Sequence, residues 1–381
     1  MQRYTFSKKI LMDINMALEK NFSILMAGGG TGGHLFPGIA LAKAFQEKNP
    51  ETKIHFFVPG TSVDKMILSS THFSFTMNPM RSLPKSYTKY CDFFCRFFLG
   101  WHKTFHAFRR CKPDLVVGLG GYGAFSAGYV SQKYNIPLVL LEANRIAGKA
   151  VKYLSKDCER IYTSGEIQGV SGAKVRPLGI PIRFSNLQGK SKNTADKKST
   201  TILVMGGSLG AQCINEALVK ALPFLVGLKN KIKFIHLCGK DAALIEKEYQ
   251  KNGLAYQVYP FYQNMEELYL ASDIVVSRSG GSTLSEITAM GMPSILVPFA
   301  RSADGHQEAN ALAMEKAKAS LVIREAELTG ELLASKVEEL VLGKEKISLM
   351  SSASLSLAKP FAARDIVCDI YDLLEKRNYC L

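Results

Sequence analysis

The sequence predicts an α/β fold with two Rossmann-like parallel-sheet domains that are separated by a deep cleft. Three observations support this prediction. The chain has 381 residues, more than one domain usually contains. Each half contains an apolar, strand-like run that leads into a glycine-rich turn and then into a helix-like segment. In both halves, further apolar runs alternate with segments that are long enough for crossover helices, which is typical of a parallel sheet.

The first glycine-rich turn, GGGTGGHLFPG, begins at Gly28 and fits the G-x-G-x-x-G pattern of dinucleotide-binding proteins. A nicotinamide site would also place an acidic residue at the end of the second strand, where it binds the ribose. The second strand-like run, KIHFFVPG at 53–60, ends in Val, Pro and Gly instead, so we disfavour a dehydrogenase. His34 directly follows the turn, where its imidazole can contact a ligand or take part in a reaction.

Apolar runs and polar gaps divide the chain into five segments. We expect strands at SILMA, KIHFFVP, FSFTM, DLVVGLG, PLVLLEA and RIYTS in the first half, and at TILVM, KFIHLCG, YQVYPF, DIVVSRS, SILVPF and SLVIRE in the second. The polar, basic stretch NLQGKSKNTADKKST between them indicates a linker. The predicted segments are an N-terminal extension at 1–22, an N-terminal domain at 23–185, a linker at 186–200, a C-terminal domain at 201–360, and a C-terminal helix at 361–381 that can pack back on the N-terminal domain.

The composition narrows the class of partner. Lysine and arginine outnumber aspartate and glutamate by 48 to 33, which gives a formal net charge of +15. This excess predicts an anionic partner: a nucleic acid, a phosphorylated substrate or an acidic membrane surface. No apolar run is long enough for a transmembrane helix, and Asp13 and Glu19 interrupt the leading segment, which argues against a signal peptide. The eight cysteines lack metal-ligand spacing, so we expect reduced thiols and no metal site.

A further glycine-rich turn, SRSGGSTLSE, follows a strand-like run in the second half. It offers backbone donors and a helix N-terminus to a diphosphate, with Arg278 beside it. We expect Ser282 or Thr283 to cap the helix. Glu286 has two interpretations: its carboxylate accepts hydrogen bonds from a ribose, or it completes a capping box.

The loop ARSADGHQEANA follows the strand-like run SILVPF. Loops at strand ends often carry residues that determine specificity. We therefore expect His306, Gln307 and Glu308 to bind sugar hydroxyls.

Seven motifs together carry a resemblance to one family. They are GGGTGGH, GLGGYGAFSAG, LLEANRIAGKA, GIPIR, MGGSLGAQCIN, SRSGGSTLSE and HQEANA, in this order between residues 23 and 311. The chain thereby resembles the MurG family, the UDP-N-acetylglucosamine:undecaprenyl-pyrophosphoryl-MurNAc-pentapeptide N-acetylglucosaminyltransferases of peptidoglycan synthesis. The resemblance implies the GT-B architecture and an inverting, metal-independent and cofactor-free transfer from UDP-N-acetylglucosamine to the MurNAc C4 hydroxyl of lipid I, which forms lipid II.

The motifs and the resemblance together assign substrate-binding roles to Thr31, Gly32, Gly33, Asn144, Arg183, Ser208, Phe261, Tyr262, Met265, Arg278, Ser279, Gly280, Thr283, Glu286, His306 and Gln307. Within this set, the resemblance implies that Glu286 binds the ribose and that the 261–265 segment surrounds the uracil. It implies that Ser208 and Arg183 contact the diphosphate, and that the 306–307 pair binds the hydroxyls of N-acetylglucosamine.

On the acceptor side, the resemblance implies that His34, Glu142 and Asn144 face the acceptor. An inverting displacement needs a base, and we predict that His34 is this base because a pKa near 6.5 suits operation at neutral pH. Glu142 is the second candidate. Helix N-termini and Arg183 or Arg278 can stabilise the UDP leaving group, and the chain contains no D-x-D pair.

Three positions depart from the family's usual pattern. The family commonly has Gln where this chain has Leu209, Asn where it has Ile180, and Gln where it has Ala143. Each departure removes an amide that could contact a ligand. The departures bear on individual donor and acceptor contacts and leave the expected reaction class unchanged.

The segment from 81 to 112 combines eight basic residues with nine aromatic ones and a single acid, Asp92. On a helix, the rings of Tyr90, Phe94, Phe97, Phe98, Trp101, Phe105 and Phe108 share one arc, beside a stripe of Lys89, Arg96, Lys103 and Arg110. Such a helix either packs on the sheet or inserts its rings beneath anionic lipid headgroups. We favour membrane contact, which would place a peripheral protein at the cytoplasmic face of the inner membrane.

Two other functions fit parts of the sequence. A related enzyme could transfer a sugar from UDP to another membrane lipid such as diacylglycerol. A nucleic-acid-binding protein would explain the charge, but the chain has no recognised binding module. We therefore expect UDP-N-acetylglucosamine, lipid I and an anionic membrane surface as partners, with other cell-wall synthesis proteins as candidates, and no nucleic acid.

Overall fold

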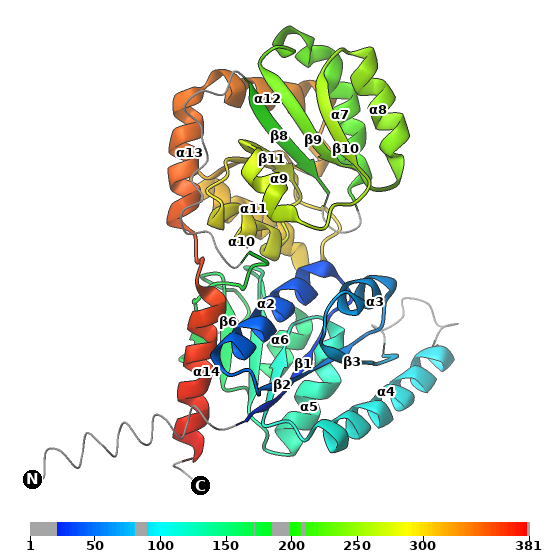
Figure 1. Ribbon diagram of the computed structural model, residues 1–381, viewed down its shortest axis with the longest axis vertical. Coiled ribbons are helices and arrows are strands. Elements are labelled where there is room, and N and C mark those ends of the chain that lie inside the picture. The colour runs from blue at the N-terminus through cyan, green and yellow to red at the C-terminus, as the bar shows by residue number, and fades with distance from the viewer. Residues whose placement is uncertain (1–20, 81–89, 171, 185–198, 207–209, 379–381) are drawn as a thin grey trace, which may run out of the picture.

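The chain forms two α/β domains stacked end to end in the computed structural model, which describes residues 21–80, 90–170, 172–184, 199–206 and 210–378 (Figure 1). Most of the predicted extension at 1–22 and of the predicted linker at 186–200 lies outside these residues. Both sheets are parallel throughout, with helices on both faces. The predicted fold class is therefore confirmed.

The N-terminal domain contains a seven-stranded sheet of order β3-β2-β1-β4-β5-β6-β7. Its strands are β1 (Ser23–Ala27), β2 (Lys53–Val58), β3 (Ser74–Met77), β4 (Leu115–Gly118), β5 (Leu138–Glu142), β6 (Arg160–Thr163) and β7 (Val175–Arg176). Its helices are α2 (Gly32–Lys48), α3 (Ser62–Ser69), α4 (Tyr90–Cys111), α5 (Phe125–Lys133) and α6 (Lys149–Leu154). All six strands predicted in this half are present, and β7 was missed because two residues are too short to show a pattern.

The C-terminal domain contains a six-stranded sheet of order β10-β9-β8-β11-β12-β13. Its strands are β8 (Thr200–Met205), β9 (Ile232–Leu237), β10 (Ala255–Tyr259), β11 (Ile274–Ser277), β12 (Ser294–Leu296) and β13 (Ser320–Val322). Its helices are α7 (Gln212–Leu225), α8 (Ala242–Lys251), α9 (Met265–Ala271), α10 (Gly281–Ala289), α11 (His306–Lys316), α12 (Gly330–Leu342) and α13 (Lys344–Ser356), and α14 (Ala362–Asn378) follows. The six predicted strands of this half are confirmed.

The central strands are apolar without interruption because helices cover both faces of each sheet. In β1, Ile24 and Met26 belong to one hydrophobic cluster and Leu25 to another on the opposite face. In β8, Val204 and Leu203 divide in the same way between two clusters of the C-terminal domain. Each sheet therefore separates two cores.

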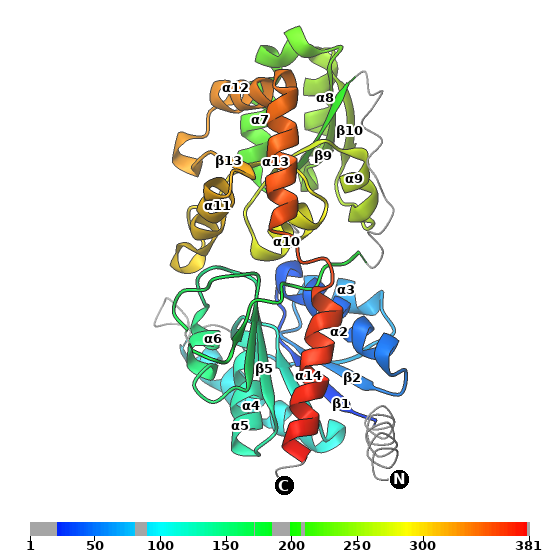
Figure 2. The same ribbon diagram turned by 90° about the vertical axis from the view of Figure 1, so that its left-hand side faces the viewer.

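Helix α14 leaves the C-terminal domain and packs against α2 of the N-terminal domain (Figure 2). The Tyr371 ring meets the Phe22 ring edge-on at a centroid distance of 5.3 Å. Asp369 accepts a hydrogen bond of 2.7 Å from the Tyr162 hydroxyl and pairs with Arg160 at 3.3 Å. The end of the chain thus completes the hydrophobic core that surrounds α2.

The first glycine-rich turn is held by a buried carboxylate. Gly29 and Gly30 have φ values of 138° and 86°, which side chains disfavour, and a Cβ at Gly29 would lie 2.8 Å from Asp64 Oδ1. Asp64 accepts hydrogen bonds from the backbone of Gly30 through Oδ1 and of Gly60 and Thr61 through Oδ2. Asp64 therefore ties the turn after β1 to the turn after β2.

No helix in the described part of the chain is both long and apolar enough to span a bilayer.

The C-terminal domain contains a buried histidine, His236. Its Nε2 lies 3.1 Å from Asn215 Oδ1, and its Nδ1 lies 3.4 Å from the Tyr249 hydroxyl. Asn215 in turn donates to the Cys238 carbonyl at 2.8 Å. Burial lowers the pKa of His236 from 6.5 to about 4, so the ring is neutral in the folded protein at neutral pH.

We predict that acid destabilises the protein partly through His236. Below pH 6.5 the unfolded chain binds a proton at this ring, whereas the folded chain does not until pH falls to about 4. The free energy of unfolding should therefore fall by up to about 3 kcal/mol between pH 7 and pH 4 from this group alone. The variant His236→Gln should lack this part of the pH dependence in urea denaturation. Equal acid sensitivity of the two proteins would contradict the prediction.

Candidate active site

Helix N-termini from both domains meet at the domain junction. Helix α2 of the N-terminal domain contacts α10 of the C-terminal domain. A Cβ at Gly281, the first residue of α10, would collide with the carbonyl of Ala143 in the loop after β5. A Cβ at Gly33 would lie 3.3 Å from Ser282 Oγ. The backbones of the two domains are thus in direct contact beside the first glycine-rich turn.

His34 lies in the first turn of α2 and is partly exposed to solvent. Its ring packs against the backbone of the GLGGYGA turn, since a Cβ at Gly120 would lie 3.0 Å from His34 Nδ1. Burial lowers the pKa of His34 below 6.5, while Glu142 and a hydrogen bond with the Leu119 backbone act in the opposite direction. His306 lowers the pKa of His34 further.

Glu142, at the end of β5, is buried and accepts three N–H groups. Its Oε1 accepts from the backbone and side-chain nitrogens of Asn144 at 3.0 and 2.9 Å, and its Oε2 accepts from the Gly148 backbone at 3.0 Å. These bonds fix the carboxylate and the loop that carries Asn144. Glu142 is therefore built into the loop more firmly than His34, which favours His34 as the proton acceptor.

Glu286 lies inside α10 and is buried. It pairs bidentately with Arg183, whose Nε and second guanidinium nitrogen donate at 2.7 and 3.0 Å, and it accepts from the Tyr269 hydroxyl at 3.1 Å. Burial and Glu286 raise the pKa of Tyr269, so its hydroxyl remains a donor. Arg183 also stacks on the Phe36 ring of α2 at 4.1 Å. Arg183 therefore bridges the two domains.

The predicted cap of α10 is wrong. Gly280 occupies the N-cap, and neither Ser282 nor Thr283 forms a side-chain capping bond. The capping-box interpretation of Glu286 fails with it, because Glu286 points to Arg183 instead. The residue that follows the N-cap, Gly281, has no room for a side chain, because a Cβ there would collide with the Ala143 carbonyl of the other domain.

Arg278, which we predicted beside the diphosphate turn, bonds within its own domain in this structure, and its contact with a diphosphate stays a prediction. Its guanidinium donates to both carboxylate oxygens of Glu325 at 3.1 and 3.2 Å and to the Val297 carbonyl at 3.2 Å. It also stacks on Phe299. Hydrogen bonds from Arg278 lower the pKa of Glu325 to about 2. Arg278 also donates to the Cys213 sulfur of α7 at 2.9 Å. Its bonds therefore hold α7, β11 and the strand-end loops together.

The segment expected around the uracil is only partly available. Phe261 is exposed, whereas the Met265 side chain is buried in the core, so only its backbone remains accessible. Tyr262 packs edge-on against Tyr259 and donates to Glu267 at 2.7 Å. Met265 can therefore contribute its backbone to a uracil site, and the assignment of this segment to the base stays a prediction.

The sugar-binding candidates lie at the start of α11. Ser279 donates to the Gln307 carbonyl at 2.7 Å, and Gln307 Oε1 accepts from the Phe299 backbone at 3.0 Å. His306 is the first residue of the helix. The structure thus brings the 306–307 pair next to the turn at Gly280.

The remaining predicted residues occupy the two turns. Thr31 and Gly33 are exposed at the start of α2 and Gly32 is buried, whereas Thr283 is partly exposed on α10. Ser208 and the departure at Leu209 lie outside the described residues.

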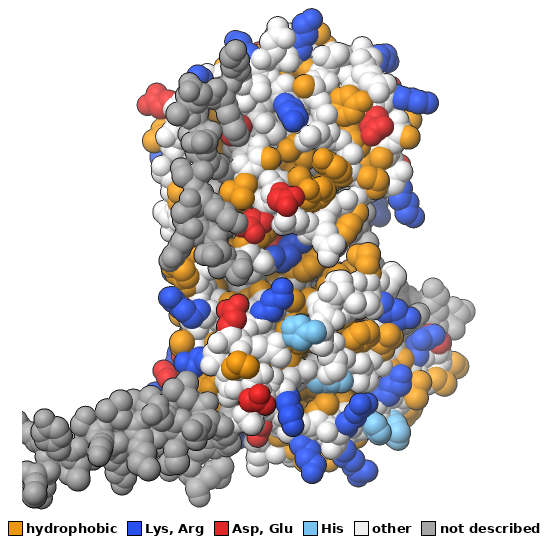
Figure 3. Space-filling view, in the orientation of Figure 1, with side chains coloured by type: hydrophobic (Ala, Val, Ile, Leu, Met, Phe, Trp, Pro, Cys, Tyr) orange, Lys and Arg blue, Asp and Glu red, His pale blue; other side chains and the backbone are white. Residues whose placement is uncertain are grey.

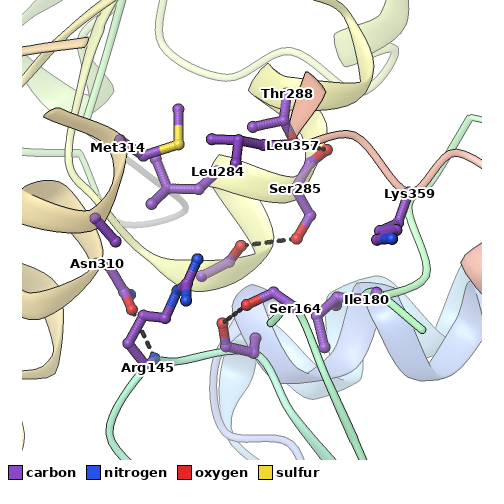
Figure 4. Close-up of a pocket in the computed structure, with 14 residues that line it drawn as sticks. Arg145, Ser164, Ile180, Leu284, Ser285, Thr288, Asn310, Met314, Leu357 and Lys359 are labelled. Atoms are coloured by element: carbon purple, nitrogen blue, oxygen red, sulfur yellow. Dashed lines mark hydrogen bonds between the residues drawn. The ribbon is translucent and has the colours of Figure 1, made fainter. Parts of the chain in front are cut away.

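The other two departures from the family's pattern, Ala143 and Ile180, line a small interdomain pocket of about 50 Å³ (Figure 4). Ile180 is buried in the core. Arg145, Ser285 and Asn310 also face this pocket. The pocket lies on α10 at a face that Glu286 does not line.

Three important residues were missed at the sequence level: Asp64, Tyr269 and Asn310. Asp64 was detectable, because Thr61-x-x-Asp64 is a capping-box pattern and the structure forms it. Asn310 lies within the HQEANA motif, but nothing local shows that its side chain crosses to the other domain. Tyr269 had no signal, since its partner is 17 residues away.

Within the described ranges, no group of three or more His, Cys, Asp or Glu side chains is arranged to hold a metal ion.

Two family models match the chain. Residues 24–163 match the glycosyltransferase family 28 N-terminal domain, and residues 201–367 match the glycosyltransferase family 28 C-terminal domain. The boundary between the two matches falls between the two sheets.

Whole-chain relatives agree with the domain matches. The chain is 34% identical over 364 residues to the UDP-N-acetylglucosamine--N-acetylmuramyl-(pentapeptide) pyrophosphoryl-undecaprenol N-acetylglucosamine transferase of Thermodesulfovibrio yellowstonii, covering 93% of this chain and 100% of that protein. It is 33% identical over 355 residues to the protein of the same name from Myxococcus xanthus, covering 92% and 93%. The fold is similar to that of MurG from Acinetobacter baumannii, with a TM-score of 0.72 at 24% identity over 93% of this chain and 99% of that one. The chain therefore belongs to glycosyltransferase family 28 and, within it, to the UDP-N-acetylglucosamine-dependent N-acetylglucosamine transferases of the MurG family.

Proposed function

We propose that the protein transfers N-acetylglucosamine from UDP-N-acetylglucosamine to the MurNAc C4 hydroxyl of lipid I, with inversion and without a metal, and so forms lipid II. The observation that carries this proposal is the hydrogen-bonded link from Glu142 through Asn144, in the domain where the His34 ring packs against the Gly120 backbone, to Asn310 of α11 in the other domain. It joins the acceptor side, which carries the two candidate bases, to the helix that carries the expected sugar contacts. The relatives named above carry this substrate pair in their names.

The donor side supports the proposal through Glu286. A carboxylate offers about four lone-pair positions, and three N–H or O–H groups of Arg183 and Tyr269 already occupy this one. To accept both ribose hydroxyls, Glu286 must release a hydrogen bond from Arg183. The N–H group of Arg183 that is released can then donate to the diphosphate, where it stabilises the charge that develops on the leaving UDP.

The acceptor side supports His34 as the general base. The lowered pKa keeps the imidazole neutral at pH 7, the form that accepts a proton. In a single in-line step, the acceptor oxygen then bonds to the anomeric carbon and passes its proton to His34, while the bond between the anomeric carbon and the diphosphate oxygen breaks and UDP leaves. The N-termini of α2 and α10 can stabilise phosphate charge on either substrate.

Helix α4 supports a location at the cytoplasmic face of the membrane. Phe94, Phe98 and Leu99 are 52%, 69% and 52% exposed, and we call these three residues the α4 apolar surface. Basic and apolar side chains lie together over this edge of the N-terminal domain (Figure 3). The helix has a second apolar face, because Phe108 on its other side belongs to the core of the domain. The α4 apolar surface therefore remains available to insert among lipid headgroups.

An assay of the purified protein with UDP-N-acetylglucosamine tests the reaction directly. Lipid I with a shortened prenyl chain should accept the sugar in the presence of a chelator, whereas diacylglycerol should not. The anomeric configuration of the product, read by NMR, tests inversion. Transfer to diacylglycerol alone would overturn the proposed acceptor.

We predict that Glu286→Gln weakens UDP-N-acetylglucosamine binding by roughly 1.5–3 kcal/mol, or about 10- to 150-fold in Kd, because hydrogen bonds to a charged group are lost. Isothermal titration calorimetry measures this change. The control Glu248→Gln removes a carboxylate that pairs with Lys251 on α8, outside the site, and should bind normally. Unchanged affinity of the Glu286 variant together with a lower melting temperature would instead assign Glu286 a structural role.

We predict that His34→Gln lowers kcat by about a hundredfold or more, since removal of a general base typically costs this much. Donor Kd should change little. In the parent protein, kcat/KM should decline only as pH falls below 6.5, because the pKa of His34 is lowered and protonation abolishes the base. Near-normal turnover of the variant would shift the role to Glu142.

We predict that Phe98→Ser weakens binding to vesicles of neutral and of anionic lipid, because a 69% exposed ring on the membrane-facing helix is lost. Arg110→Gln should weaken only the anionic case, by up to about 1 kcal/mol, and added salt should remove the difference. Phe224→Ser removes a 57% exposed ring of α7 in the other domain and is the matched control. Sedimentation with vesicles measures all three. If Phe98→Ser behaves like Phe224→Ser, α4 is not the contact surface.

A further inference from the structure

The side chain of Asn310 crosses from one domain to the other. Asn310 lies on α11 of the C-terminal domain and is 2% exposed. Its amide points down toward the loop after β5 of the N-terminal domain, beside the interdomain pocket (Figure 4). A buried amide must satisfy its polar atoms, and this one does so with both domains.

Three hydrogen bonds hold the amide. Asn310 Oδ1 accepts from the Arg145 backbone at 2.8 Å, and Asn310 Nδ2 donates to Asn144 Oδ1 at 3.0 Å. Nδ2 also donates to the Ser279 carbonyl at 2.9 Å. Two of these partners belong to the acceptor-facing loop and one to the turn that precedes α10.

The partners also determine which way each amide faces. The Arg145 N–H requires an acceptor and the Ser279 carbonyl requires a donor, so the Asn310 oxygen and nitrogen cannot exchange places. Asn144 is fixed in the same way, because its nitrogen donates to Glu142 Oε1 at 2.9 Å. Its oxygen is therefore left to accept from Asn310.

These hydrogen bonds form one continuous path across the junction. It runs from the Ser279 carbonyl through Asn310 and Asn144 to the buried carboxylate of Glu142. On the donor side, Ser279 Oγ continues the path to the Gln307 carbonyl at 2.7 Å. This hydrogen-bonded path thus connects the expected sugar-binding helix to Glu142, the second candidate for the base.

This series of hydrogen bonds can form only because the backbones of the two domains approach each other closely. Because Gly281 carries no side chain, α10 can approach the Ala143 carbonyl directly. A short amide such as asparagine spans the remaining gap only while the domains are in contact. Separation of the domains would break the bonds from Asn310 to Asn144 and to Arg145 and leave the bond to Ser279 intact.

We propose that Asn310 is a positioning residue that holds the donor-binding turn against the acceptor-binding loop in the closed, reactive arrangement of the two domains. This inference rests on the proposed glycosyl transfer. Asn310 acts on the reaction through Asn144 and Ser279 and contacts neither substrate. Loss of the bridge should therefore reduce the rate of transfer and spare donor binding, because small misplacements of reacting groups are costly in rate.

The test uses the full chain with Asn310→Ala and Asn310→Asp. Transfer from UDP-N-acetylglucosamine to a short-chain lipid I should show a kcat that is ten- to hundredfold lower for Asn310→Ala, while the calorimetric Kd for UDP-N-acetylglucosamine stays within about twofold. Asn310→Asp should be at least as impaired, because its carboxylate would face the Ser279 carbonyl and Asn144 Oδ1. Small-angle X-ray scattering should show a larger radius of gyration for both variants.

Asn252→Ala is the matched control, since the Asn252 side chain donates to the Glu248 carbonyl of its own domain. It should leave kcat, Kd and the radius of gyration unchanged. Melting curves identify any variant that fails to fold. Asn310→Ser, which keeps one donor and one acceptor, then replaces that variant. It should show the same changes in kcat and radius of gyration, but smaller ones.

Two results would overturn the proposal. A tenfold weaker donor Kd with kcat retained would make Asn310 a sugar ligand. Unchanged kcat and unchanged scattering would make the bridge dispensable. If the parent protein transfers no sugar to lipid I, the proposed function fails, whereas the scattering comparison still decides whether Asn310 holds the domains together.

Discussion

The contact between the Gly281 backbone and the Ala143 carbonyl is the constraint on which the site depends. It sets the distance between the two sheets. The polar residues of the site follow the strand ends of both sheets. At this distance, Asn310 bonds to Asn144, and the Arg183 guanidinium reaches both Phe36 and Glu286. Any side chain at position 281 would widen the junction and move each of these groups away from its partner.

Most polar groups at the junction are already satisfied by one another. Glu142 accepts three N–H groups, and Arg183 and Tyr269 occupy Glu286. A substrate therefore enters by exchanging partners and not by filling empty positions. Because an unsatisfied buried group costs more than a hydrogen bond gains, a ligand that lacks the matching hydroxyls or phosphates cannot displace the internal bonds. This exchange makes the closed junction selective before any chemistry takes place.

The fold was largely predictable from the sequence. For the site, the sequence predicted which residues lie near it better than which hydrogen bonds and ion pairs they form. Strands such as β1 and β8 were found because burial on both faces makes them continuous apolar runs. The cap of α10 was predicted wrongly because Ser282 and Thr283 have the right chemistry for a cap, whereas the helix begins earlier, with Gly280 at its N-cap.

The pairing of Arg183 with Glu286 was hidden because 103 residues separate them, and that of Arg278 with Glu325 because 47 do. The α4 pattern was ambiguous for another reason: the same helix carries Phe108 in the core and Phe98 on the surface. Periodicity along one helix does not distinguish a face covered by the protein from a face covered by something else.

The return of α14 to the N-terminal domain has a consequence for biosynthesis. The N-terminal sheet leaves the ribosome first, but the surface of α2 that meets Tyr371 stays uncovered until α14 emerges. During that interval the C-terminal domain already has all of its strands. The domain that is synthesised first is therefore completed last, and its exposed apolar face is the part of the nascent chain that most needs protection from aggregation.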